Sequence, residues 1–190
     1  MADDLELLQT YMDIVACDLS MRRPGFALLR YYYKSRHVKI LETSNIDNKT
    51  TSAGKNKCYG EVLSEIAAEL RRLLTKVPLG PVVREEALKK SGTCASGKVL
   101  SILNRVVGVS DLYAWGFGGR EFVEIPPQTV KKLVTDNANA EKDEVAAALK
   151  QFVGDWDYAC DDESDAVAVG VAWLIQQEMI DNPYEKVKKK

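Results

Sequence analysis

Histidine, paired cysteines and long apolar runs are all scarce in this chain of 190 residues. The one histidine is His37, and the four cysteines stand far apart without a CxxC pair: Cys17, Cys58, Cys94 and Cys160. Such a set supports neither a zinc module nor a disulfide framework, so we expect reduced thiols. No stretch reaches the roughly 18 apolar residues of a membrane span, and the acidic start is unlike a secretory signal. We therefore expect a cytoplasmic protein without membrane association.

The formal net charge of −2 decides little about partners, because a local basic patch can act within an acidic remainder. The length and a hydrophobic share of 46% suit one substantial core. We expect a single domain over residues 1–190, with its core at about 12–180, an acidic N-terminal lead-in and a basic C-terminal tail.

Short apolar runs alternate with amphipathic ones along the chain. An antiparallel meander of three strands is predicted at 11–17, 26–33 and 38–43. Further strands are predicted at 81–85, 112–115 and 122–125, and helices at 61–75, 98–107, 126–133, 144–153 and 162–175. This order predicts an α/β fold in which helices flank a mixed sheet.

Negative charge is concentrated between Asp155 and Asp165, where six of eleven residues are acidic. An apolar stretch at 166–175, typical of a buried helix, follows directly. Asp162 and Asp165 are three residues apart, so on a helix their carboxylates share one face and can hold a cation. Acids at a helix N-terminus can also simply complement the macrodipole, a contribution of only ~0.3–1 kcal/mol per charge. Both interpretations are open for this run alone.

Other acids stand at the ends of apolar runs. Asp18 follows the first predicted strand, and Glu85 follows Val82 and Val83. Strand ends are rigid points where side chains leave the core, so these acids can converge with the D-x-x-D pair at one sheet edge. Four carboxylates in one place are best explained by divalent cations, and oxygen-only ligation favours Mg²⁺ or Mn²⁺. Two such ions, about 3.5–4 Å apart, serve phosphodiester cleavage in nucleases and polymerases.

The order and spacing of these acids resemble the RuvC-type Holliday junction resolvases of the RNase H-like nuclease superfamily. An Asp-bearing strand is followed by further strands, a later strand bears a Glu, and D-x-x-D opens the terminal helix. The resemblance extends to Lys131, in a V-K pair, and to Lys142, the lysine of an A-E-K triplet eleven residues later. It covers about residues 12–179 and includes the expectation of three antiparallel strands followed by parallel strands.

The resemblance implies roles for named residues. Catalysis and the binding of two Mg²⁺ or Mn²⁺ ions are assigned to Asp18, Glu85, Asp162 and Asp165, with Lys142 as a further catalytic residue. The resemblance places Lys131 and Lys142 near the scissile phosphate or its neighbours, and Leu88 is a candidate apolar wedge in the DNA. Further DNA contacts are expected from Lys89, Lys90 and Lys98, which flank a Gly-rich turn, although this segment is equally well explained as a solvated loop and helix start. Neighbouring strand residues face opposite sides, so only one of Glu85 and Glu86 can point into the site, and the family pattern favours Glu85. Leu88 stands where cellular members often carry an aromatic wedge, which indicates a phage or viral relative.

By this resemblance the protein is a metal-dependent endonuclease that resolves four-way DNA junctions by paired symmetric nicks, with water as the nucleophile. Junction symmetry implies a homodimer, for which the helices at 61–75 and 98–107 are candidate interfaces. It would act in the bacterial cytosol or in a phage- or virus-infected cell. The alternatives are an RNase H-like nuclease for other branched or single-stranded DNA, and a junction-binding protein without catalysis.

Several other features have simpler interpretations. The G-x-x-x-x-G-K at 92–98 lacks the following Ser or Thr of a phosphate-binding loop, so no nucleotide cofactor is expected. At least one of the tyrosines at 31–33 should face the core, and His37 should lie on the surface. Packing roles are expected for Trp115, Trp156 and Trp173. Solvated positions ahead of the last helix are expected for Asp155, Asp157, Asp161 and Glu163.

Overall fold

The computed structural model describes residues 10–48, 57–87 and 97–185 and contains a five-stranded mixed sheet with the strand order β3-β2-β1-β4-β5. The strands are β1 (Tyr11–Asp18), β2 (Gly25–Tyr32), β3 (His37–Asn45), β4 (Val82–Glu85) and β5 (Val123–Ile125). The first three pair antiparallel, while β4 pairs parallel with β1, and β5 with β4. The predicted order of antiparallel strands followed by parallel ones is confirmed.

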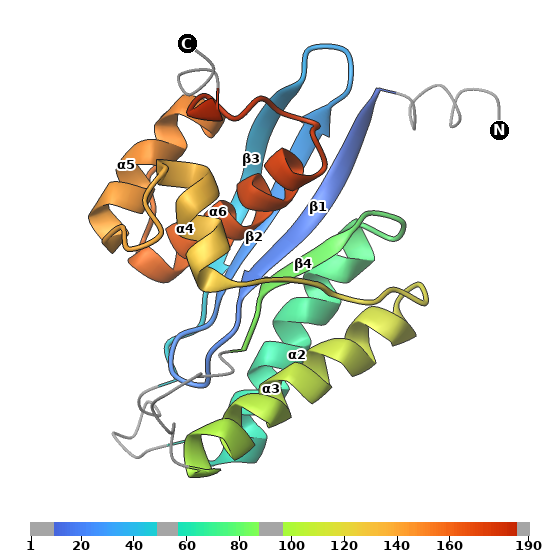
Figure 1. The fold of residues 1–190 in the computed structure, drawn as a ribbon. Coiled ribbons are helices and arrows are strands. Elements are labelled where there is room, and N and C mark those ends of the chain that lie inside the picture. Colours follow the sequence, from blue (N-terminus) through green and yellow to red (C-terminus); the bar gives the residue numbers. More distant parts are fainter. Residues whose placement is uncertain (1–9, 49–56, 88–96, 186–190) are drawn as a thin grey trace, which may run out of the picture.

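Two layers of helices cover the sheet, one on each face (Figure 1). One layer consists of α2 (Tyr59–Lys76) and α3 (Gly97–Gly116), and the other of α4 (Pro127–Thr135), α5 (Lys142–Val153) and α6 (Asp161–Gln176). None of the helices in the described part of the chain combines the length and apolarity needed to cross a lipid bilayer.

Strand alternation decides which layer each side chain of β1 meets. Ile14 and Ala16 pack in the core beneath α6, whereas Val15 and Cys17 pack beneath α2. Because successive side chains of a strand point to opposite faces, Asp18 projects on the α6 side of the sheet. In β4 the same alternation puts Val83 and Glu85 on the α6 side, and Val82 and Arg84 on the other. Two acids from neighbouring strands therefore face the same helix.

Helix α6 is buried on almost every side, as its apolar sequence predicts. All residues from Ala166 to Ile175 are buried. A Cβ atom added at Gly170 would overlap the side chain of Leu29, so glycine lets the helix lie close to β2. The first turn of α6, which carries the acids, is thus fixed on the hydrophobic core.

The prediction of a strand at residues 112–115 is wrong, because this segment forms the last turns of α3. Burial repeats every four residues there, at Val106, Ser110 and Ala114. Leu112 and Trp115 lie on the outer face, with 68% and 64% of their surface exposed. The apolar run therefore has a helical period, in which half of the large side chains point to solvent.

The tryptophans differ in their environments. Trp173 is buried, as expected of a packing residue, but Trp115 and Trp156 are exposed, so the packing prediction is wrong for these two. Tyr31 is buried and Tyr33 exposed, which confirms that at least one tyrosine of that run faces the core. His37 is exposed at the start of β3, and the thiols of Cys17, Cys58 and Cys160 are free.

Candidate active site

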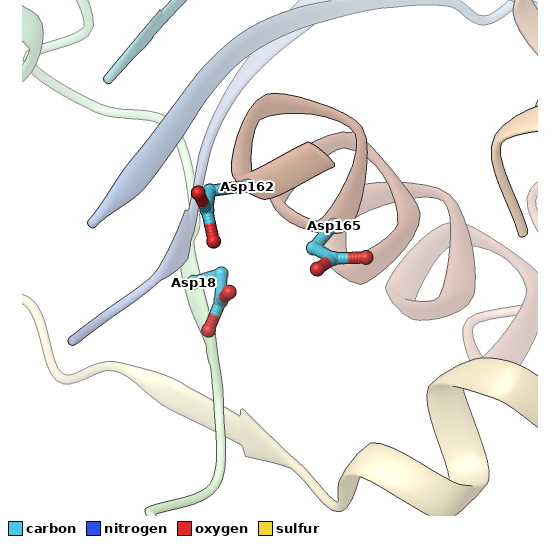
Figure 2. Close-up of side chains that lie close together, drawn as sticks. All are labelled: Asp18, Asp162 and Asp165. Carbon is cyan, nitrogen blue, oxygen red and sulfur yellow. The ribbon is translucent and has the colours of Figure 1, made fainter. Parts of the chain in front are cut away.

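Three carboxylates meet where the end of β1 faces the first turn of α6. They belong to Asp18, Asp162 and Asp165, and one oxygen from each lies within 4.8 Å of the others. Figure 2 shows Asp162 and Asp165 on the same side of α6, with Asp18 beside them. The three-residue spacing of the D-x-x-D pair brings its two acids onto one helix face, and strand alternation supplies the third.

Glu85 lies next to this group on the neighbouring strand. Cys17 pairs with Arg84 in the parallel register of β1 and β4, so the residues that follow, Asp18 and Glu85, stand side by side at the strand ends. Burial, followed by the charges of Asp18 and Asp165, raises the pKa of Glu85 to about 8. Glu85 is not one of the three closest carboxylates, but it shares their electrostatic field.

Two acids of the group, Asp18 and Asp165, have raised pKa values. Burial is the main reason that the pKa of Asp18 is raised to about 7, and the charges of Asp165 and Asp162 raise it further. Burial likewise raises the pKa of Asp165, although a hydrogen bond from Lys142 acts in the opposite direction. In the protein without bound cations, ionising all of these acids is therefore unfavourable.

Basic side chains partly compensate the acids. The ammonium nitrogen of Lys142, at the start of α5, lies 3.0 Å from Asp165 Oδ2 and 3.7 Å from Asp162 Oδ1. Burial alone would lower the pKa of Lys142, but the hydrogen bond to Asp165 and the neighbouring acids raise it. The charge of Lys131, on α4, acts on Glu85. Both lysines named by the family resemblance therefore lie at the carboxylates.

The donor set fits a hard divalent cation. It offers only carboxylate oxygens, which Mg²⁺ and Mn²⁺ prefer, and neither histidine nor cysteine joins the group of three. Burial first, and the neighbouring acids second, raise the pKa values of Asp18 and Glu85, and a bound cation would favour the ionised form of both carboxyls. The acidic triad can thus hold a metal ion.

Two residues at the site were missed from the sequence. Arg23, in the loop after β1, lies 3.7 Å from Asp162. Glu163 was expected to be solvated, but only 4% of its surface is exposed, because it accepts hydrogen bonds from β3. The expectation for Glu163 is therefore wrong, whereas Asp155, Asp157 and Asp161 are exposed as predicted.

Some predicted DNA contacts cannot be placed. Leu88, Lys89 and Lys90 lie outside the described residues. Lys98 lies in the first turn of α3, where only the course of the backbone is described. These four residues stay predictions.

Comparison with known proteins relates the chain to one group of enzymes. No protein-family model matches it. It is 29% identical over 152 residues to the crossover junction endodeoxyribonuclease RuvC of Brachyspira hyodysenteriae, covering 78% of this chain and 88% of that protein. The RuvC of Ehrlichia ruminantium is 27% identical over 170 residues, covering 86% and 96%.

A solved structure of similar fold is the RuvC of T. thermophilus in complex with a Holliday junction substrate. The TM-score is 0.72 at 16% sequence identity, and the match covers 88% of this chain and 96% of that one. The predicted RNase H-like mixed sheet is thereby confirmed as the fold.

Proposed function

We propose that this chain, which is related over most of its length to the RuvC crossover junction endodeoxyribonucleases, is itself a metal-dependent endonuclease that resolves four-way DNA junctions by paired symmetric nicks. The observation that carries the proposal is the convergence of Asp18, Asp162 and Asp165 within 4.8 Å on a RuvC-like fold. A protein that used Asp162 and Asp165 only as helix caps would have no reason to place the carboxylate of Asp18, from another element, beside them.

The four carboxylates of Asp18, Glu85, Asp162 and Asp165 are the proposed ligands of two Mg²⁺ or Mn²⁺ ions. Such ions, when bound, polarise the scissile phosphate and lower the pKa of an attacking water. The chain's own contribution is to present the carboxylates from fixed elements. Asp162 and Asp165 are held by the buried helix α6, and Asp18 and Glu85 by adjacent strand ends. Preorganised ligands avoid the cost of ordering them during the reaction.

Lys142 and Lys131 are proposed to contact the DNA backbone at the reacting phosphate or its neighbours. Half of the Lys142 side chain is exposed although its nitrogen contacts Asp165, so its ammonium group is open to a phosphate oxygen. The charge of Lys131, on α4, lowers the pKa of Glu85 against the larger effect of burial. Arg23 adds a third cation on the β1–β2 loop. These cations would hold a negatively charged strand over the acids.

We infer that the partner subunit is a second copy of this chain that docks on α3 and β5. The helices at 61–75 and 98–107 are the candidate interfaces from the sequence. The apolar face of α2 packs in the core, so α3 is the remaining candidate. Large apolar side chains are exposed on this surface at Leu100, Leu112, Trp115 and Val123. A cavity of about 590 Å³ adjoins them, lined by apolar, basic and acidic residues, among them Arg84, Trp115 and Glu124. A two-fold interface needs such self-complementary chemistry.

The test is cleavage of a four-way junction with and without Mg²⁺, by the wild type and by Asp162→Asn. We expect paired nicks that require Mg²⁺ in the wild type. The variant should bind the junction within about twofold of wild type and cleave at least 10²-fold more slowly, because it loses ligand charge but keeps its shape. The control is Asp157→Asn, which removes a nearby exposed charge and should cleave normally. Unchanged cleavage by Asp162→Asn would refute the assignment.

The two alternatives are separated by the same assay. Equal rates on four-way, three-way and linear substrates would favour a nuclease of wider substrate range. Binding to the junction without cleavage under any metal condition would favour a protein that only recognises junctions.

A further inference from the structure

Glu163 is a buried acid on the helix turn that carries two of the three converging carboxylates. Its Oε2 accepts hydrogen bonds from Thr43 Oγ1 at 2.7 Å and from the backbone nitrogen of Ala159 at 3.1 Å. Its Oε1 accepts one from Asn45 Nδ2 at 2.8 Å. A buried polar group that lacks partners is costly, but this one has three. Two of the donors belong to β3, so the side chain connects the start of α6 to the far edge of the sheet.

The direction of these hydrogen bonds is fixed by the neighbours. Trp156 donates its indole Nε1–H to Thr43 Oγ1 at 3.2 Å. Because an indole nitrogen can only donate, Thr43 accepts this bond and directs its own hydroxyl proton to Glu163. Glu163 therefore acts here purely as an acceptor, a role that a carboxylate fills and a neutral amide fills only in part.

A row of residues across the sheet determines where this turn of α6 lies. Asp18 on β1 pairs with Gly25 on β2, and Gly25 pairs with Asn45 on β3. A Cβ atom at Gly25 would overlap the backbone carbonyl of Asp162, so the turn touches the sheet at the middle of the row. Asn45 holds Glu163 at one end, and Asp18 faces Asp162 at the other.

We propose that Glu163 is a positioning residue that sets the rotation of α6 about its own axis, and so aims Asp162 and Asp165 at Asp18. On a helix Glu163 lies about 130° around the axis from the middle of the Asp162–Asp165 face. The hydrogen bonds to Glu163 on that side act as a tether. They resist a rotation of α6 that the backbone contact at Gly25 alone would allow. The proposal rests on the proposed function, because it concerns how the same carboxylates are presented to metal and DNA.

The size of the expected effect follows from the distance between the helix axis and the carboxylate oxygens. Carboxylate oxygens lie roughly 5–6 Å from the axis, so a rotation of about 10° moves them by about 1 Å. A displacement of that size at a reacting centre can reduce the rate on the order of 10²-fold. Loss of the tether should therefore affect metal binding and cleavage far more than DNA binding.

The experiment compares Glu163→Ala, which removes the whole tether, and Thr43→Val, which removes one of its three hydrogen bonds, with the double variant. Three quantities are measured. Mn²⁺ binding to the protein alone is followed by electron paramagnetic resonance, and junction affinity is measured without divalent metal. The cleavage rate is measured in single turnovers with Mg²⁺. We expect each single variant to weaken Mn²⁺ binding about tenfold and to slow cleavage by about 10–100-fold, with junction affinity within twofold of wild type. The double variant should be no worse than the poorer single variant.

Two further variants separate positioning from charge and folding. Glu163→Gln keeps the size but offers fewer acceptor atoms, so it should fall between wild type and Glu163→Ala. Asp157→Asn removes an exposed charge close to the start of α6 and should leave Mn²⁺ binding unchanged. Thr43→Val is isosteric, so it decides the question if Glu163→Ala does not fold.

The outcomes distinguish the two proposals. If the wild type binds Mn²⁺ and cleaves junctions, but folded Glu163→Ala and Thr43→Val do both equally well, Glu163 is only structural and the inference is wrong. Additive effects in the double variant would also contradict it. If the wild type itself neither binds Mn²⁺ nor cleaves junctions, the proposed function fails.

Discussion

Asp18→Asn should stabilise the metal-free protein while it abolishes cleavage. Asp18 has a pKa of about 7 in the folded protein against an ordinary value of 3.8, mainly because it is buried and then because Asp165 and Asp162 repel its charge. In the unfolded chain these causes disappear. Above pH 7 the carboxyl is ionised in both states, so the folded state carries the full cost of the charge. Asparagine keeps the shape and carries no charge.

The magnitude follows from the pKa difference. Each pKa unit corresponds to about 1.4 kcal/mol, so the charge of Asp18 costs the folded state about 4 kcal/mol at pH 8. At pH 5 the folded carboxyl is largely protonated, and the cost falls to about 2 kcal/mol. Coulomb's law gives the same order, because two unit charges 4.8 Å apart at an effective dielectric constant of 20 repel by about 3.5 kcal/mol. The advantage of Asp18→Asn should thus grow with pH.

The assay is equilibrium unfolding by urea in EDTA at pH 5 and at pH 8. We expect the free energy of unfolding of Asp18→Asn to exceed that of wild type at both pH values, by about 2–3 kcal/mol more at pH 8 than at pH 5. Adding Mg²⁺ should stabilise the wild type more than the variant, since ligands stabilise the state that binds them. Asp157→Asn, an exposed control outside the helix, should change stability by less than about 0.5 kcal/mol. A variant less stable than wild type at pH 8, or an advantage independent of pH, would refute this electrostatic account.

Two further predictions concern the metal and the partner. Mg²⁺ affinity should rise with pH up to about 8, because cation binding must displace protons from Asp18 and Glu85, whose pKa values are about 7 and about 8. Calorimetry in buffers of different ionisation enthalpy would detect the released protons. An affinity that does not change between pH 6 and 8 would contradict this prediction. Trp115→Glu should convert a dimer into monomers in light scattering and replace paired nicks by single ones, whereas Leu79→Glu, at another exposed apolar site, should do neither.

Much of the arrangement of the acids followed from local rules. The end of β1 at Asp18 and the helix that opens at the D-x-x-D pair depend on periodicity and spacing within a few residues. Strand alternation limited the candidates to one of Glu85 and Glu86, the family pattern favoured Glu85, and the structure places Glu85 on the α6 side of the sheet. Where the pattern was strong and short-ranged, the sequence was sufficient to predict the geometry.

The errors arose where distant contacts decide the environment. Glu163 appeared to be one more acid in a charged run, but its donors Thr43 and Asn45 lie about 120 residues earlier in the chain. No count of neighbouring charges could reveal them. The run ending at Trp115 is a short apolar stretch with residues on both faces of a helix, and such a stretch does not distinguish a helix from a strand. Whether a large apolar side chain is covered depends on the packing of the whole fold.

The opposite orientations of Arg84 and Glu85 connect the two sides of the molecule. Arg84 is buried on the α3 side, where it pairs with Asp111 of α3 and Glu124 of β5. The next residue, Glu85, faces the carboxylates on the other side. Arg84, which pairs with α3, and Glu85, a proposed metal ligand, are therefore joined by a single peptide unit. A small displacement of β4 from the α3 side would be transmitted to the acids by covalent geometry, without any rearrangement of the intervening core.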